Sequence, residues 1–411
     1  MLAELIPQKH QAYRSLPILG GTLDDFDDWM IQQGYRFSTR QVYIERCRII
    51  DLYFRHRRCS LASLTFAQVR RCHRYFRPRA EYIASVVGCL KRFLLSQHKI
   101  APIASSTPFD ELLASYRYYM LDVRGLAPTS ADSHSRTINE FLHYVHRIRR
   151  TFALAHLHPH HVDRFVRSVA ARLGRQSLQH VACHIRAFIR FLRLKGHMPA
   201  GPDFVIYKPR LYRGEQLPRA LPWETVRAFL KSFDRDAGAG RRDYAMFLLI
   251  ATYGLRGCDI AGLRLDDIDW RAGVIHVRQR KTRSPLELPL TRPVAVALLA
   301  YLRKARPQTS QRCVFFSAVA PVIPLTPHMV GYAFRTRIKA GNLKIPFKGV
   351  YCLRHSYALH LLRSGVPLKT IGDLLGHTTI ESTGVYLRVH IDDLREIALP
   401  LPSAATGRLS S

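Results

Sequence analysis

Acidic residues are scarce in this chain of 411 residues. There are 30 Asp and Glu against 63 Lys and Arg, which gives a formal net charge of +33 at pH 7. Arg is much commoner than Lys, and its guanidinium group suits paired contacts with phosphate oxygens. Because the basic residues run through the whole chain, they favour a nucleic-acid partner over a solvated basic surface or a membrane surface.

Other features are missing from the sequence. No apolar run reaches the length of a membrane span, and the first residues lack the order of a signal peptide. The eight cysteines are scattered without a C-x-x-C pair, which argues against a disulfide framework or a zinc site. From these absences we expect a cytoplasmic, nucleoid-associated protein of bacterial type. The sequence also has no P-loop and no acidic metal cluster, so we expect the protein to use no cofactor and no metal.

The first two hundred residues read as one helical unit used twice. Gly34 corresponds to Gly125 and Phe93 to Phe191, so the two copies are offset by roughly 90 to 98 residues, as expected of a duplication with small insertions. Gly34 and Gly125 are each predicted to end a helix, and Ser38 and Thr129 to cap the next one. Basic clusters recur at matched places in the two copies, which favours phosphate contacts. The clusters are Arg55, Arg57 and Arg58, and Arg147, Arg149 and Arg150.

Composition and periodicity divide the rest of the chain. A stretch rich in Pro, Gly and basic residues marks a linker, and beyond it helical and strand periodicities mix. We therefore expect a mainly α fold with a small β component. The predicted parts are an N-terminal helical DNA-binding unit at 1–103, a second helical domain at 104–200, a linker at 201–220, a mixed α/β domain at 221–400 and a disordered tail at 401–411.

The mixed domain has readable elements. The segments VIHV and LELPL, separated by the polar turn RQRKTRSP, predict a β-hairpin. The run MFLLIA predicts a helix buried on all sides. Helices are predicted at 222–233, 241–253, 293–303, 328–340, 353–364, 368–375 and 381–389.

Five side chains of this domain together suit attack on a phosphodiester. They are Arg256 in YGLRGC, Lys281 in RQRKTR, Arg354 in YCLRHS, His377 in LLGHT and Tyr386 in VYLRV. Tyr386 is the candidate nucleophile, and the two guanidinium groups can each hold two phosphate oxygens. Lys281, in the hairpin turn, can protonate the leaving 5′ oxygen, and His377 can donate a hydrogen bond to a non-bridging oxygen. Each residue alone is a weak signal, and the joint pattern is specific.

The order and spacing of these residues resemble the tyrosine recombinase (phage integrase) family, strongly over about residues 215–390. The resemblance implies helical SAM-like core-binding units followed by a mixed α/β tyrosine-recombinase catalytic domain, which together clamp DNA. It also implies four protomers on two DNA sites and exchange through a Holliday junction. A C-terminal helix near 391–397 would pack on a neighbouring protomer.

One position departs from the family pattern. The family usually has His three residues before the second Arg, where it acts as a base toward the nucleophile, and here that residue is Tyr351. A phenol can orient the nucleophile but is a poor base at pH 7. His355 follows Arg354 directly, and adjacent positions on a helix point about 100° apart. His355 is therefore expected to be a structural residue, or one that acts through its neighbours, and not a substitute for the usual base.

The resulting functional hypothesis is site-specific DNA strand exchange of integrase or transposase type through a 3′-phosphotyrosine, without metal or ATP. The expected partners are double-stranded DNA, three further copies in a homotetramer and, as an option, a partner recombinase. Three alternatives stay open: a catalytically silent or partner-dependent DNA-binding protein, a type IB topoisomerase-like enzyme, and a structural nucleoid or RNA-binding protein. The target sequence, the biological outcome and the role of the duplicated unit are not given by the sequence.

Overall fold

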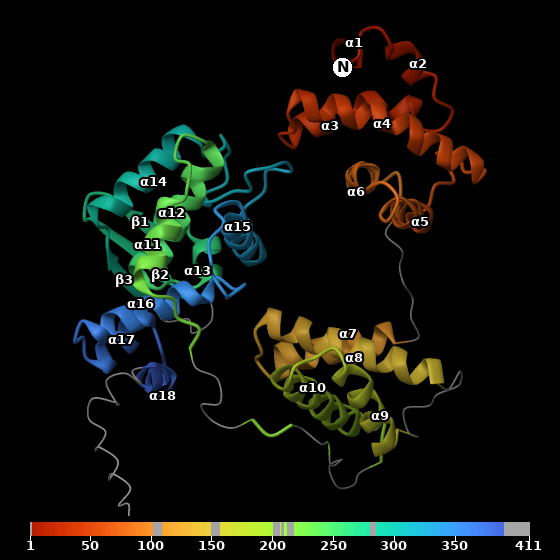
Figure 1. Ribbon diagram of the computed structural model, residues 1–411. Coiled ribbons are helices and arrows are strands. Elements are labelled where there is room, and N and C mark those ends of the chain that lie inside the picture. The colour runs from red at the N-terminus through yellow and green to blue at the C-terminus, as the bar shows by residue number, and fades with distance from the viewer. Residues whose placement is uncertain are drawn as a thin grey trace, which may run out of the picture. The chain divides into compact units, whose positions relative to one another are not determined.

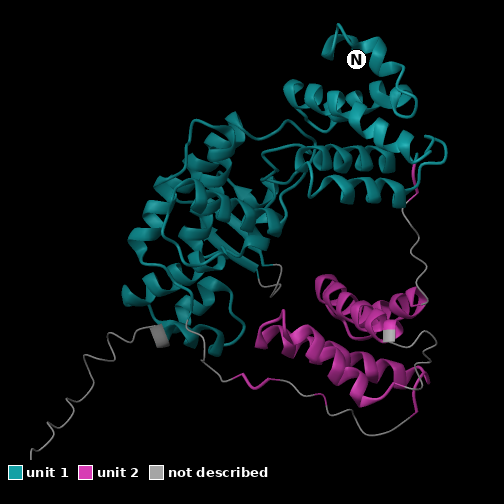
Figure 2. Ribbon diagram, turned by 45° about the vertical axis from the view of Figure 1, so that its right-hand side comes forward, with its two compact units in different colours: residues 1–99, 216–411 teal, residues 100–215 magenta. Residues whose placement is uncertain are grey.

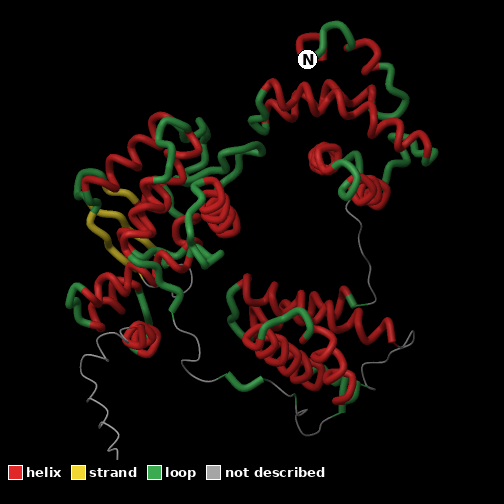
Figure 3. Tube along the Cα trace, viewed as in Figure 1, coloured by secondary structure: helices red, strands yellow, loops and turns green. Residues whose placement is uncertain are grey.

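The computed structural model describes residues 2–101, 109–148, 157–199, 206, 209–211, 218–279 and 285–389. The chain divides into two compact units, residues 1–99 with 216–411 and residues 100–215, and each is described by itself (Figure 2). The described residues are mainly helical, with one small sheet, which confirms the predicted fold class (Figure 3). None of the helices in these residues is both long and apolar enough to span a membrane.

Residues 1–99 of the first unit form a helical bundle (Figure 1). Aromatic side chains fill its centre: Phe26, Phe54 and Phe93 are fully buried, and Phe26 packs on Phe93 with ring centroids 5.2 Å apart. The helices are α1 (Leu2–Leu5), α2 (His10–Arg14), α3 (Leu23–Gln32), α4 (Phe37–His56), α5 (Phe66–Phe76) and α6 (Glu81–Ser96).

The second unit repeats this order of helices. A long helix, a shorter one and a second long one follow each other, as they do in α4, α5 and α6. Its core includes Phe141, Phe165, Phe188 and Phe191. The helices are α7 (Asp110–Tyr118), continued by a π-helical turn (Tyr119–Val123), α8 (Pro128–Ile148), α9 (Pro159–Ala170) and α10 (Arg175–Leu194).

The helix ends predicted at glycines are confirmed, whereas the predicted polar N-caps of these helices are wrong. Gly34 and Gly125 have φ of 77° and 62°, in the left-handed region, so both helix ends are confirmed. The predicted caps at Ser38 and Thr129 are wrong, because α4 and α8 begin at or before the preceding residue. The extended Arg36 is the N-cap of α4, without a side-chain hydrogen bond.

The mixed part of the first unit is built around α12 (Gly238–Tyr253). Its run MFLLIA is buried, apart from the half-buried Leu248, because α12 packs against α11 (Trp223–Lys231), α14 (Arg292–Lys304) and α16 (Tyr351–Arg363). The remaining helices are α13 (Gly257–Gly262), α15 (Pro327–Ala340), α17 (Leu368–Leu375) and α18 (Glu381–Gly384), with 3₁₀ turns at Leu265–Asp267 and Val385–Val389.

The predicted hairpin is present. Strands β1 (Ile268–Asp269), β2 (Val274–Arg278) and β3 (Pro285–Pro289) form an antiparallel sheet in that order, with Ile275 opposite Leu288. The alternating register buries Ile275 and Val277 and exposes His276 and Arg278. The end of β2 is therefore held against the core, and the segment with Lys281, outside the described residues, follows Gln279 in the chain.

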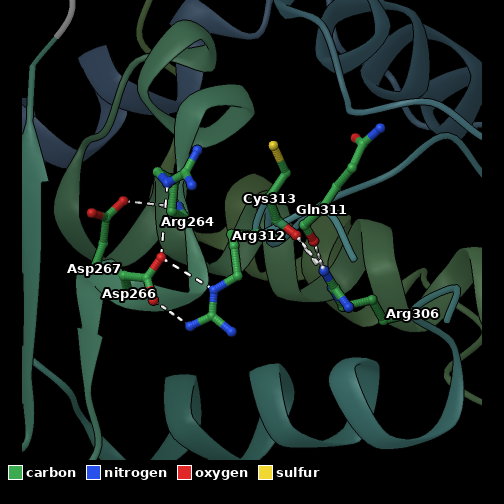
Figure 4. A network of polar contacts seen from close by, with 7 residues as sticks. All are labelled: Arg264, Asp266, Asp267, Arg306, Gln311, Arg312 and Cys313. Carbon is green, nitrogen blue, oxygen red and sulfur yellow. Dashed lines mark hydrogen bonds and ion pairs between the residues drawn. The ribbon is translucent and has the colours of Figure 1, made fainter. Parts of the chain in front are cut away.

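A polar network holds the loop after α14 beside the sheet (Figure 4). Arg312 is paired with Asp266, and the Asp267 carboxylate accepts the backbone N–H of Arg264 at 2.8 Å. Arg306 donates to the carbonyl oxygens of Gln311 and Cys313 at 2.6 and 2.9 Å. These bonds lie around the isolated antiparallel bridge between Arg264 and Cys313.

Several predicted helix boundaries need correction. Helix α12 begins at Gly238 and not at residue 241, and α11 ends at Lys231 and not at residue 233. Two further corrections concern candidate site residues. Helix α16 begins at Tyr351 and not at residue 353, which places Tyr351 in its first turn. The predicted helix 381–389 is the short α18 followed by the 3₁₀ turn Val385–Val389, which carries Tyr386.

Candidate functional site

Arg256 is positioned by a helix stop and a helix start. Gly254 ends α12 with φ of 63°, a conformation that side chains disfavour. A Cβ there would approach Tyr357 Cδ1 to 2.6 Å and Leu375 Cδ2 to 2.7 Å, so only glycine fits. Arg256 then caps α13, and its backbone N–H donates to Asp259 Oδ2 at 3.3 Å. The guanidinium is thereby directed from a rigid turn, with the residue only 6% exposed.

Arg354 lies on α16 and is 1% exposed. Its Nη1 donates to the Gly254 carbonyl at 2.6 Å and its Nη2 to the Leu375 carbonyl at 2.7 Å. Its fork therefore joins the end of α12 to the end of α17. Each terminal nitrogen carries two hydrogens, so each keeps one N–H after these bonds.

Gln279, at the end of β2, connects the two arginines. It is fully buried, accepts from Arg256 Nη1 at 2.5 Å and donates through Nε2 to the Leu375 carbonyl at 2.9 Å, the oxygen that Arg354 also contacts. Gly376, the residue after Leu375, has φ of 60°, and a Cβ at this position would collide with the Gln279 amide. Sequence reasoning missed Gln279; its signal is its place two residues before Lys281.

Tyr386 is buried, with 2% of its surface exposed. It packs with Ala358 of α16 and with Ile371 and Leu375 of α17. Burial raises the pKa of its phenol to about 12, although Arg354 and Arg256 act in the opposite direction. The phenol is therefore protonated at neutral pH and lies in the field of both arginines.

The neighbours of Tyr386 differ from the expectation for His355. His355 Nδ1 lies 3.1 Å from Tyr386 Oη, whereas Tyr351 Oη accepts from Arg256 Nε at 3.3 Å. The sequence argument considered only the direction of His355 relative to Arg354 and did not anticipate its contact with Tyr386. Tyr386 comes from a turn 31 residues later and meets the face of α16 on which His355 lies.

His377 follows the left-handed Gly376 at the end of α17. Its backbone N–H donates to the Gly372 carbonyl at 2.9 Å, and its Nδ1 lies 2.8 Å from Thr383 Oγ1. Leu375, whose carbonyl is shared by Gln279 and Arg354, stands two residues before it. Lys281 lies outside the described residues, in the segment that joins β2 to β3.

The electrostatics of the site suit an anion. Burial and the nearby Arg256 lower the pKa of the Arg354 guanidinium, while Tyr351, Tyr386 and Asp259 act in the opposite direction. A bound phosphate would offset the unfavourable proximity of two buried cations. Across the described ranges, no group of three or more His, Cys, Asp or Glu side chains is placed to hold a metal ion.

Comparisons with known proteins identify the family of this chain. Residues 220–392 match the phage integrase family, and residues 113–196 match the N-terminal SAM-like domain of phage integrases. A Sinorhizobium fredii protein named as an integrase/recombinase, y4rA, is 30% identical over 92% of this chain and 94% of its own. The tyrosine recombinase XerD of Listeria innocua is 25% identical over 70% of this chain and 96% of its own.

Solved structures share the fold. The XerH site-specific recombinase in a post-cleavage complex with its difH substrate covers 69% of this chain and 83% of its own, with a TM-score of 0.53 at 16% identity. The Tn1549 transposon integrase, in complex with transposon right end DNA, covers 69% of this chain and 99% of its own, with a TM-score of 0.51 at 14% identity.

Proposed function

Because the chain belongs to the phage integrase family of tyrosine recombinases, enzymes that break and rejoin DNA, we propose that it exchanges strands at specific DNA sites through a bond between Tyr386 and a 3′ phosphate. One observation carries the proposal. Arg256 and Arg354, 98 residues apart in sequence, are tied together through Gln279 and one carbonyl oxygen, and both act on the buried phenol of Tyr386.

The proposed roles follow from the geometry and from residue chemistry. The free N–H groups of Arg256 and Arg354 hold the non-bridging phosphate oxygens, where negative charge grows in the transition state. His377, anchored on Thr383, donates a further hydrogen bond, and Tyr351 orients Arg256 through their mutual bond. Lys281 delivers the proton to the leaving 5′ oxygen. The phosphotyrosine conserves the energy of the broken bond, so the cycle requires neither ATP nor a metal.

The proposed substrate is double-stranded DNA, and the net charge of +33 supports a polyanionic partner. We propose that four copies assemble on two sites, alone or with a partner recombinase, in the cytoplasm at the nucleoid. Light scattering of the protein mixed with a four-way DNA junction tests the stoichiometry. Four protomers per junction are expected, and a stable complex of one protomer would favour topoisomerase-like action.

The covalent step is tested with a suicide substrate, a duplex nicked so that the cleaved end diffuses away. Wild-type protein is incubated in chelator and without ATP with the ends of its own genetic element, beside Tyr386→Phe. A covalent adduct on a denaturing gel, lost in the variant, is the expected result. Specific binding of both proteins without any adduct would instead indicate a catalytically silent or partner-dependent DNA-binding protein.

A further inference from the structure

The hydroxyl of the nucleophile is held by His355, which directly follows Arg354 and does not stand at the position of the usual base, three residues before it. His355 Nδ1 lies 3.1 Å from Tyr386 Oη, and the ring centroids are 5.6 Å apart. The residue at the usual position, Tyr351, directs its hydroxyl to Arg256 Nε at 3.3 Å. These contacts give Tyr351 and His355, both on α16, different partners.

Helix geometry explains this division. Tyr351 and His355 are four residues apart on α16, so they share a face, and their ring centroids are 5.3 Å apart. Tyr351 is 44% exposed at the start of the helix, while His355 is half-buried one turn further along, with its ring against that of Tyr386. Of these two side chains, His355 is the more buried and is the one within hydrogen-bond distance of the nucleophile.

The surroundings of His355 keep it neutral. Burial, Arg354 next to it and Arg219 from the segment before α11 lower its pKa to about 4. The segment of Arg219 is tied to α16 by the Leu221 N–H, which donates to Ser356 Oγ at 2.7 Å. With its proton on Nε2, the neutral ring presents an Nδ1 lone pair, and Tyr386 donates its O–H to it.

We propose that His355 is the catalytic residue that positions Tyr386 and accepts its proton during strand cleavage, which Tyr351 cannot do. The proposal rests on the function proposed above. The Tyr386 Oη–P bond forms, the P–O5′ bond breaks, and its electron pair leaves with O5′, which takes a proton from Lys281. The phenolic proton moves to His355 Nδ1. In rejoining, the attacking 5′ hydroxyl gives its proton to Lys281 and His355 returns its proton to Tyr386.

The timing of the transfer follows from acidity. The pKa of the phenol is raised to about 12 and that of His355 is lowered to about 4, so the proton stays on oxygen at rest. As the Oη–P bond forms, the oxygen loses electron density and its proton becomes acidic. The bound phosphate also offsets the positive field of Arg354, which makes His355 a better acceptor. Transfer therefore accompanies bond formation.

Two matched substrates distinguish a residue that accepts the nucleophile's proton from one that donates a proton to the leaving group. One suicide duplex has a normal phosphodiester, and the other has sulfur in place of the bridging 5′ oxygen, which leaves without a proton. We expect His355→Ala to slow adduct formation about 10²-fold on both substrates. Lys281→Ala should be slow on the first and restored on the second. Tyr351→Phe, which keeps the ring but loses the bond to Arg256, should be affected less than His355→Ala.

A pH profile excludes a merely structural role. His355→Asn places an amide oxygen near the site of Nδ1 and should restore orientation without basicity. Between pH 6 and 9, titration of His355 should not alter the wild-type rate of adduct formation. The rate of His355→Ala should instead rise about tenfold per pH unit, because hydroxide takes the proton of Tyr386. Added imidazole should partly restore His355→Ala. Melting temperature and DNA affinity, measured for every variant, show that each is folded and binds.

The possible failures are distinguishable. A wild-type adduct that forms equally fast with His355→Ala, or a His355→Ala defect restored by the sulfur leaving group, would overturn this proposal alone. Loss of activity in Tyr351→Phe with normal activity in His355→Ala would return the base to position 351. The absence of an adduct from wild-type protein on both substrates would overturn the proposed function and this proposal with it.

Discussion

The arginines of the candidate site and those of residues 1–99 are used in opposite ways. Arg256 and Arg354 are almost fully buried, and their donors are directed to an amide oxygen, a phenol and two carbonyl oxygens. Exposed arginines instead gather at the end of α4 and along and after α5: Arg55, Arg57, Arg58, Arg70, Arg71, Arg74, Arg77 and Arg79.

This difference separates chemistry from binding. A buried guanidinium is costly to desolvate, and its fixed bonds aim the remaining N–H groups at one place. An exposed guanidinium keeps its water and many conformations, so it contributes a small, salt-dependent share to the binding of a polyanion. We therefore expect site variants to lose rate with little loss of affinity, and variants in 1–99 to lose affinity with little loss of rate.

Arg354→Ala should have the largest effect. It removes a phosphate ligand, takes away the Arg354 donor of the Gly254 carbonyl and leaves the Leu375 carbonyl with Gln279 as its side-chain donor. Adduct formation on saturating DNA should therefore fall about 10²- to 10³-fold. Single-turnover cleavage on the suicide duplex measures it. Arg363→Ala, at an exposed position of the same helix, is the control. A variant that binds tenfold more weakly but cleaves at the normal rate would contradict the comparison.

Gln279→Ala should come next. It removes the acceptor of Arg256 and a donor to Leu375, and we expect a loss of about 1–3 kcal/mol in unfolding free energy together with slower cleavage. Denaturant unfolding and the suicide assay measure the two effects. Gln279→Glu keeps the acceptor for Arg256 and should retain more activity than Gln279→Ala. His276→Ala, exposed on the same strand, serves as the matched control.

The stability of the second helical unit should fall in acid because of His184. Burial, followed by His134 and His180, lowers the pKa of His184 to about 4, below the usual value of about 6.5. The unfolded chain therefore binds this proton first, so stability is complete above pH 6.5 and declines as the pH falls toward 4, by up to about 3 kcal/mol. Hydrogen exchange of α10, corrected for intrinsic rates and compared with α6, measures it.

Replacing His184 sharpens that test. His184→Gln should flatten the pH dependence of α10, whereas His180→Gln, at an exposed position of the same helix, should leave most of it. An unchanged profile in His184→Gln would assign the acid sensitivity to other groups.

The smallest effect is expected from the exposed arginines. Arg55→Ser, Arg57→Ser and Arg58→Ser combined should weaken DNA binding about tenfold and reduce the salt slope by about 2 to 3. The cleavage rate on saturating DNA should stay the same. Titrations at several salt concentrations measure the slope, and the triple variant of Arg70, Arg71 and Arg74 is the comparison. Loss of rate without loss of affinity in either triple would break the distinction between the two regions.

The sequence predicted much of this fold and part of the site. Hydrophobic periodicity located the helices and the hairpin, and left-handed glycines marked the helix ends. The motif spacing identified Arg256, Arg354 and Tyr386 as candidate site residues, because each lies at the end or on the face of an element that the sequence predicts.

The residues it missed depend on contacts distant in sequence. Gln279 bonds to a carbonyl 96 residues away, and an uncharged amide has no catalytic signature. His355 was judged from its own helix, whereas its contact is set by where the turn of Tyr386 returns to α16. The caps at Ser38 and Thr129 failed because helices α4 and α8 extend past them.

Identifying the residue that carries the DNA tests the central claim most directly. The adduct trapped on a suicide duplex is digested with protease and nuclease, and mass spectrometry locates the tyrosine that bears the nucleotide. The account predicts one modified residue, Tyr386, joined to a 3′ phosphate. Modification of another tyrosine, attachment to a 5′ phosphate, or an adduct that persists in Tyr386→Phe would contradict it.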